Sequence, residues 1–126
     1  MNYARFENAL DATAHLREMR KPKTRAQFLG KCADQLNIRV AKVAEIGVYR
    51  GCFSQELRGQ FPEAELYLVD PWGHIPELMN LGGHMHRAGV TPEGNRRHWD
   101  IIRMEVKNKF HNDPSTHLIR KLSKDA

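Results

Sequence analysis

The chain has 126 residues, enough for one small domain, and 40% of them are hydrophobic, which excludes a chain that is disordered by composition. Its formal net charge is +5, but the basic residues are scattered along the sequence, so a nucleic-acid partner is not favoured. No apolar run approaches the ~20 residues of a membrane span, and the N-terminus lacks the apolar core of a signal peptide. We therefore expect a cytoplasmic protein that does not associate with membranes.

Two helices are predicted ahead of the first strand. One spans residues 2–19, and its apolar face would consist of Tyr3, Phe6, Leu10 and Ala14. After a basic linker, Thr24 suits the N-cap of a second helix that runs to about Leu36. The apolar face of that helix would consist of Phe28, Leu29, Cys32, Ala33 and Leu36. Residues 1–38 would then form a helical cover for one face of a sheet.

The stretch from Val43 to Asp70 reads as strand, glycine turn, helix and second strand. Gly47 and Gly51 bracket a turn where the backbone bends sharply or approaches a ligand closely. A glycine turn at a helix N-terminus offers N–H groups to a polar or anionic ligand, and an acid about 20 residues further on can accept ribose hydroxyls. This pattern is typical of half of a nucleotide-binding crossover.

The later part of the chain predicts a long loop, a helix and a third strand. Residues 73–95 are rich in Gly, Pro and His and form a candidate lid or binding loop. Helical periodicity returns at about Arg96, and its apolar stripe consists of Trp99, Ile102, Val106 and Phe110. A third strand is expected from Thr116 to Ser123. Carboxylate partners at ligand spacing are absent around the loop histidines, so a metal site is not favoured.

Alternating strands and helices predict parallel strands joined by right-handed crossovers. We expect an α/β fold, a Rossmann-like three-layer sandwich with a partial parallel sheet in the order 3-2-1 and two N-terminal helices. Residues 39–126 would form the Rossmann-like half-domain. Ligands of such sheets bind at the carboxyl ends of the strands.

The segment Glu45-Ile46-Gly47-Val48-Tyr49-Arg50-Gly51, with Ser54 and then Val69-Asp70-Pro71-Trp72, resembles class I S-adenosylmethionine-dependent methyltransferases. It is most similar to the subgroup that contains macrocin-type O-methyltransferases and cephalosporin-hydroxylase-like proteins, whose first motif reads E-x-G-V-x-x-G-x-x-S. The resemblance covers roughly residues 40–126, the N-terminal, cofactor-binding half of such an enzyme. It implies methyl transfer from S-adenosylmethionine to an oxygen or nitrogen atom of a small molecule.

The resemblance also implies roles for individual residues. Glu45 would anchor the amino-acid end of the cofactor through its ammonium group or a water molecule, with Ser54 near the carboxylate. Gly47 and Gly51 would let the turn approach the methionine and ribose portions, and Asp70 would bind both ribose hydroxyls. Ser123 would border the adenine. The expected cofactor-binding set is completed by Tyr49, Pro71 and Trp72.

Two departures from the family pattern keep other functions open. The widespread first motif has glycine where Tyr49 stands, and the sequence contains no fourth strand. One alternative is a non-catalytic half-domain that acts in assembly or binds a partner. A second is a nicotinamide-dependent oxidoreductase, but that class predicts G-x-G-x-x-G, which residues 47–51 do not supply. We expect the chain to be an N-terminal fragment of a longer enzyme, or to complete its sheet by self-association.

Overall fold

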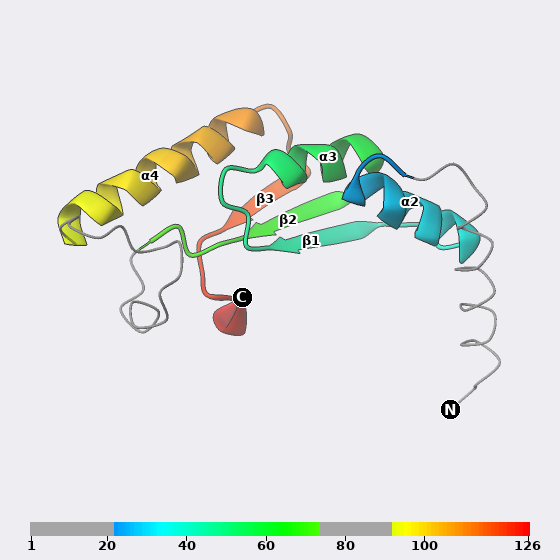
Figure 1. The fold of residues 1–126 in the computed structure, drawn as a ribbon, viewed down its shortest axis with the longest axis horizontal. Helices are drawn as coiled ribbons and strands as arrows, with labels where there is room; N and C mark the ends of the chain where they lie inside the picture. The colour runs from blue at the N-terminus through cyan, green and yellow to red at the C-terminus, as the bar shows by residue number, and fades with distance from the viewer. Residues whose placement is uncertain (1–21, 74–91) are drawn as a thin grey trace.

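The computed structural model describes residues 22–73 and 92–126 (Figure 1). The elements in chain order are α2 (Arg25–Gln35), β1 (Lys42–Ile46), α3 (Cys52–Gln60), β2 (Glu65–Val69), α4 (Pro92–Lys109), β3 (Thr116–Ile119) and a short 3-10 helix, η2 (Ser123–Asp125). The helix predicted over residues 2–19 lies outside the described residues. So does residue range 74–91, which contains most of the candidate lid and the histidines His74, His84 and His86.

The three strands form one parallel sheet in the order β1-β2-β3. Read from its other edge this is the predicted order 3-2-1, so the small parallel α/β architecture is confirmed. The register aligns Glu45 with Leu68 and Leu68 with Leu118. The carboxyl ends of all three strands therefore meet at one edge of the sheet, beside the turn after β1.

Helices α2, α3 and α4 lie on the same side of the sheet in Figure 1. Burial alternates along β1: Glu45 is buried among the helix-facing side chains, whereas Ala44 and Ile46 are exposed on the other face. Among the described residues the sheet thus has one covered face, so two of the three predicted layers are present. The core between the layers contains Leu57, Leu66, Leu68, Trp72 and the whole predicted stripe of α4, that is, Trp99, Ile102, Val106 and Phe110.

Helix α2 begins at the predicted residue, but the side of the helix that was predicted to be buried is exposed. The Thr24 hydroxyl accepts a hydrogen bond from the Gln27 N–H, which confirms Thr24 as the N-cap. The predicted apolar face was wrong, however, because α2 packs against α3 through Ala26 and Gly30. A Cβ at Gly30 would lie 2.1 Å from Nε2 of the flexible Gln60 side chain, so a larger residue at this position would require the Gln60 side chain to move. The larger side chains point outward: Phe28, Leu29 and Leu36 are 46%, 44% and 48% exposed.

Two predicted boundaries were also wrong. Helix α4 begins at Pro92 rather than Arg96, since proline suits the first helical position and Glu93 lies in the first turn, where an acid is favourable. Strand β3 ends at Ile119 and does not reach Ser123. There the Arg120 guanidinium contacts the Trp72 carbonyl and the Asp100 carboxylate, and the Lys121 N–H turns back to the Ile119 carbonyl.

Arg58 fastens the opposite end of the sheet. Its guanidinium donates to the Ala64 carbonyl, to the Ser115 carbonyl and to the Thr116 hydroxyl, and its Nε lies 2.7 Å from Asp113 Oδ2. Burial alone would raise the pKa of Asp113, but hydrogen bonds from Thr116 and the Ser115 N–H and the charge of Arg58 outweigh it and lower the pKa. This cluster joins the loop before β2 to the loop before β3.

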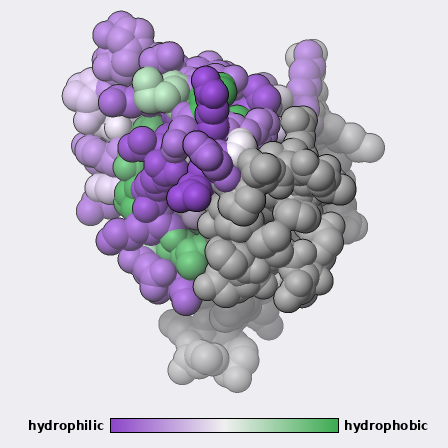
Figure 2. All heavy atoms as spheres, turned by 90° about the vertical axis from the view of Figure 1, so that its left-hand side faces the viewer, coloured by the Kyte–Doolittle hydropathy of each residue, from purple (hydrophilic) through white to green (hydrophobic). Residues whose placement is uncertain are grey.

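The outer surface near α4 is mainly hydrophilic. Figure 2 views the end of the molecule that carries α4, and the described residues there show only small hydrophobic patches. Two of the exposed apolar side chains of α4 are Ile101 and Met104. The hydrophobic stripe of α4 therefore faces the core, as its periodicity predicts.

Candidate functional site

The turn between β1 and α3 has an unusual backbone. Gly47, Tyr49 and Gly51 have φ angles of 82°, 56° and 74°, in the left-handed region. Glycine adopts this region freely, whereas a tyrosine there is strained and is held by its surroundings. The Gly47 N–H donates to the Val69 carbonyl, and the Gly51 N–H donates to the Val48 carbonyl. The turn is thereby fixed to the end of β2.

Asp70, directly after β2, holds this turn through its side chain. Its Oδ2 accepts hydrogen bonds from the Val48 and Tyr49 N–H groups, both at 2.9 Å. Its Oδ1 accepts the Trp72 N–H at 2.7 Å. Two turn N–H groups that were expected to face a ligand therefore donate to Asp70 instead. An ionised carboxylate has about four acceptor positions, so one remains on Asp70.

Trp72, in the loop after β2, also binds the turn after β1. It is fully buried, its φ is 36°, and its indole N–H donates to the Tyr49 carbonyl at 2.9 Å. Its own carbonyl accepts from Arg120. A bulky residue with positive φ is a genuine outlier, and here it coincides with the strained Tyr49. The two loops at the sheet edge thus form one rigid unit.

Beneath this unit, the motif residues Glu45 and Ser54 form a buried pair. The Ser54 hydroxyl donates to Glu45 Oε2 at 2.5 Å, and both side chains are buried. Burial raises the pKa of Glu45, and the negative charge of Asp70 adds to this effect. The Ser54 hydrogen bond and the positive charge of Arg25 oppose it. The nine-residue spacing places Glu45 on β1 and Ser54 in the first turn of α3, so the hydrogen bond between them joins the strand to the helix.

Arg25 also belongs to the site, although no sequence motif points to it. The guanidinium of Arg25 lies 4.1 Å above the centre of the Phe53 ring, and its charge reaches Glu45. An arginine at the start of α2 carries no signal for this position, because the packing of α2 on α3 decides it. It supplies positive charge beside the α3 N-terminus.

Tyr49 extends outward from the turn toward α4. It is 50% exposed, and its ring meets the Trp99 ring edge-on, at 6.0 Å between centroids. The adjacent Arg50 forms an ion pair with Glu105, and Lys109 donates to the Arg50 carbonyl. Trp99 is buried, yet its indole N–H has no hydrogen-bond partner among residues 22–73 and 92–126. A buried donor without an acceptor is costly, so a bound ligand with an acceptor at this position would remove an energetic penalty.

The turn leaves room for a ligand at Gly47 but not at Gly51. A Cβ at Gly47 would meet no atom of the described chain within 4 Å, whereas one at Gly51 would meet Val106 at 3.4 Å. No side chain caps the N-terminus of α3. The backbone at Gly47 therefore lies open at the carboxyl edge of the sheet, where open α/β folds bind their ligands.

Eight of the nine predicted site residues belong to this one region, and Ser123 does not. Ser123 is exposed in η2, beyond the end of β3, so the predicted place at the tip of the third strand was wrong. Tyr49 and Pro71 are accessible, and Gly47 is open. In contrast, Glu45, Ser54, Asp70 and Trp72 are buried and hold the turn from within.

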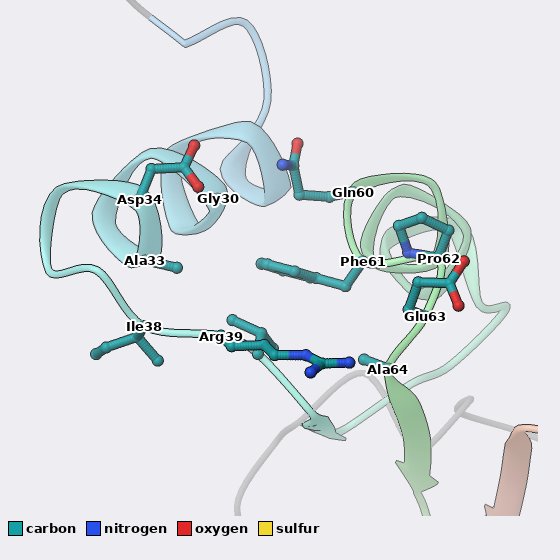
Figure 3. A pocket seen from close by; sticks show the side chains of 11 residues that line it. Gly30, Ala33, Asp34, Ile38, Arg39, Gln60, Phe61, Pro62, Glu63 and Ala64 are labelled. Atoms are coloured by element: carbon teal, nitrogen blue, oxygen red, sulfur yellow. The ribbon is translucent and has the colours of Figure 1, made fainter.

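A separate cavity lies at the opposite end of the sheet. It has a volume of about 270 Å³ and is bounded by the end of α2 and by the loops that lead into β1 and β2. The Phe61 ring points into it from the end of α3, and Asp34, Arg39 and Glu63 stand around it (Figure 3). It lies at the amino ends of the strands, away from the glycine turn. Among residues 22–73 and 92–126, no three His, Cys, Asp or Glu side chains gather as a metal site.

Comparison with protein-family models, with curated proteins and with solved structures found no match to this chain. The family resemblance accordingly rests on the motif residues themselves. No helix in the described part of the chain is both long enough and apolar enough to cross a membrane.

Proposed function

We propose that the chain binds S-adenosylmethionine at the turn after β1 and belongs to an enzyme that transfers its methyl group to a small-molecule oxygen or nitrogen. The observation that carries this proposal is the glycine turn, which is braced by Asp70 and has open space over Gly47 at the carboxyl edge of a parallel sheet. Such rigidity suits catalysis by positioning, since methyl transfer requires the two reactants in line at close range.

The residues present fit the cofactor, with one restriction. Asp70 retains one free acceptor position, so it can accept one ribose hydroxyl without rearrangement. Accepting both hydroxyls, as the resemblance implies, would require Asp70 to release the Trp72 N–H. The indole N–H of Trp99, beside Tyr49, has no acceptor in the described part of the chain and is a further donor for a ligand acceptor.

Glu45 and Ser54 would act at the amino-acid end. Because both side chains are buried, the cofactor would have little direct contact with them, and Glu45 would attract the ammonium group through its charge or a water molecule. The uncapped N-terminus of α3 favours a carboxylate. When bound, S-adenosylmethionine supplies an electrophilic methyl group on a sulfonium. The protein's contribution would be to hold that group in a fixed orientation and to keep the turn rigid.

The two other functions make different predictions. A nicotinamide-dependent oxidoreductase would bind NAD, although, with Gly47 as the first glycine of G-x-G-x-x-G, Tyr49 and Cys52 stand where its motif has the second and third glycines. A non-catalytic half-domain would bind neither compound and would use its free sheet edge. In the described sheet both β1 and β3 pair only with β2, and on β1 the side chain of Ile46 is 59% exposed. Self-association through β1 would appear as a dimer in light scattering during size-exclusion chromatography.

Isothermal titration of the full chain with S-adenosylmethionine, S-adenosylhomocysteine and NAD separates these functions. We expect saturable binding of the first two compounds, weak in an isolated monomer, and none of NAD. Binding of NAD alone would establish the oxidoreductase, and absence of binding by all three up to millimolar concentration would reject a cofactor site. A methyl-transfer assay would then test turnover separately.

A further inference from the structure

Helix α2 presents its larger apolar side chains to the outside. Its small residues Ala26 and Gly30 face α3, whereas Phe28, Leu29 and Leu36 are each nearly half exposed along the opposite side. We call these three, with the half-buried Cys32 between them, the outer stripe. A helix that stands at the surface normally turns its polar side outward. The outer stripe therefore has the character of a buried face that no described residue covers.

A groove deepens the N-terminal end of the outer stripe. It has a volume of about 550 Å³, and its walls come from Phe28, Leu29 and Phe53 together with Pro22 to Arg25. Lys23 and Arg25 make its rim basic. Pro22, the first described residue, lines the groove, so the 21 residues before it leave the described structure directly at this place.

We propose that residues 2–19 of the same chain form an amphipathic helix that covers the outer stripe. Residues 20–24 would then join two antiparallel helices, a connection length that helical hairpins commonly use. At 1.5 Å per residue, 18 residues extend about 27 Å, enough to run past the whole of α2.

The sequence of this segment matches the outer stripe in both shape and charge. Phe6, Leu10 and Ala14 would lie on one side, with small Ala14 near the bulky Phe28 and Leu29. The three acids of the segment share one flank of that apolar side at helical spacing, beside the basic rim of the groove; they are Glu7, Asp11 and Glu18. A hairpin also brings Leu10 level with Cys32, within about one helical turn.

The expected proximity of Leu10 to Cys32 provides the test. In the full chain with Cys52→Ser, the variant Leu10→Cys should form an intrachain disulfide with the native Cys32 under mild oxidation, seen as a faster band on a non-reducing gel. The matched control is Ala12→Cys, which would lie on the far side of the same helix and should stay reduced. A disulfide-linked dimer would identify a second copy as the occupant and overturn the proposal. Equal crosslinking of the control would overturn it too.

Hydrogen exchange keeps the proposal testable without cysteine chemistry. In the wild-type chain the amides of residues 6–16 should be protected, and Phe28→Asp should accelerate their exchange by about tenfold or more. The control is Met104→Asp on α4, a side chain with nearly the same exposure, 47%, which should leave these amides unchanged. Circular dichroism would establish that both variants remain folded. Unprotected amides in the wild-type chain, or equal acceleration by both variants, would overturn the proposal.

Discussion

Replacing Asp70 by alanine should destabilise the fold by several kcal/mol, because this one carboxylate accepts three backbone N–H groups. Two of the donors, the N–H groups of Val48 and Trp72, are in buried surroundings, and the third, on Tyr49, is partly accessible to water. A buried donor left without a partner costs about 1–3 kcal/mol, so the two buried donors predict a loss of about 2–6 kcal/mol. That is a large share of the ~5–15 kcal/mol that stabilises a typical domain.

The variant Asp70→Asn separates the acceptor function from the mere presence of a side chain. The amide oxygen can still accept the Val48 and Tyr49 N–H groups, but the amide N–H₂ would face the Trp72 N–H, donor against donor. We expect a loss of about 1–3 kcal/mol, smaller than for alanine. The exposed Asp34→Asn serves as a control and should change stability by less than about 0.5 kcal/mol.

Urea unfolding followed by tryptophan fluorescence measures these losses, since Trp72 and Trp99 are both buried in the core. An Asp70→Ala variant within 0.5 kcal/mol of the wild type would refute the bracing function. In whichever Asp70 variant stays folded, affinity for S-adenosylhomocysteine should fall by about 1.5–3 kcal/mol, the range for a hydrogen bond to a charged group. Unchanged affinity would remove Asp70 from the binding site and leave its structural function intact.

Three further variants test the parts of the site separately. Gly47→Val should lose cofactor binding before it unfolds, since the valine side chain would enter the open space over Gly47, while the positive φ costs a branched residue only about 1–2 kcal/mol of stability. Full affinity in titration would show that the turn does not face the ligand. Because burial raises the pKa of Glu45 above 4.5, ionising Glu45 lowers the free energy of unfolding as the pH rises through the folded pKa. Glu45→Gln, which can still accept a hydrogen bond from Ser54, should flatten that decline in urea unfolding between pH 4 and pH 7. An unchanged pH profile would contradict the assignment. The pKa of Asp113 is instead lowered below 3.8, so the stabilisation by its carboxylate is present above that pH and is lost as the pH falls through the folded pKa. Asp113→Asn should therefore cost about 1.5 kcal/mol of stability at pH 7, and this difference from the wild type should shrink toward pH 2. A difference that stays constant with pH would argue against the ion pair with Arg58.

The sequence was sufficient for the parts of the fold that depend on local pattern. The alternation of strands and helices predicts the parallel sheet, and the spacing of Trp99, Ile102, Val106 and Phe110 identifies the buried stripe of α4. Thr24 is a correct N-cap because its hydroxyl needs only the backbone three residues ahead. Asp70 falls at the strand tip because the length of β2 fixes it there.

What could not be predicted depends on contacts between distant segments. Periodicity identifies the apolar side of α2, but the side that packs against α3 carries the small buried residues Ala26 and Gly30, which hydrophobicity does not single out. The acceptor function of Asp70 depends on the strained φ of Tyr49, a conformation that a tyrosine does not signal. β3 ends early because Arg120 binds the Trp72 carbonyl from another loop, which no strand propensity encodes.

Hydrogen exchange of the full chain with and without S-adenosylhomocysteine tests the central claim most directly, because it reports both binding and its place. We predict that the ligand slows exchange at residues 47–54 and 70–73, around the braced turn, while the cavity residues from Phe61 to Ala64 remain unchanged. Saturable binding with protection at the cavity instead, or no slowing at the turn at saturating ligand, would contradict a cofactor site at Gly47 and Asp70.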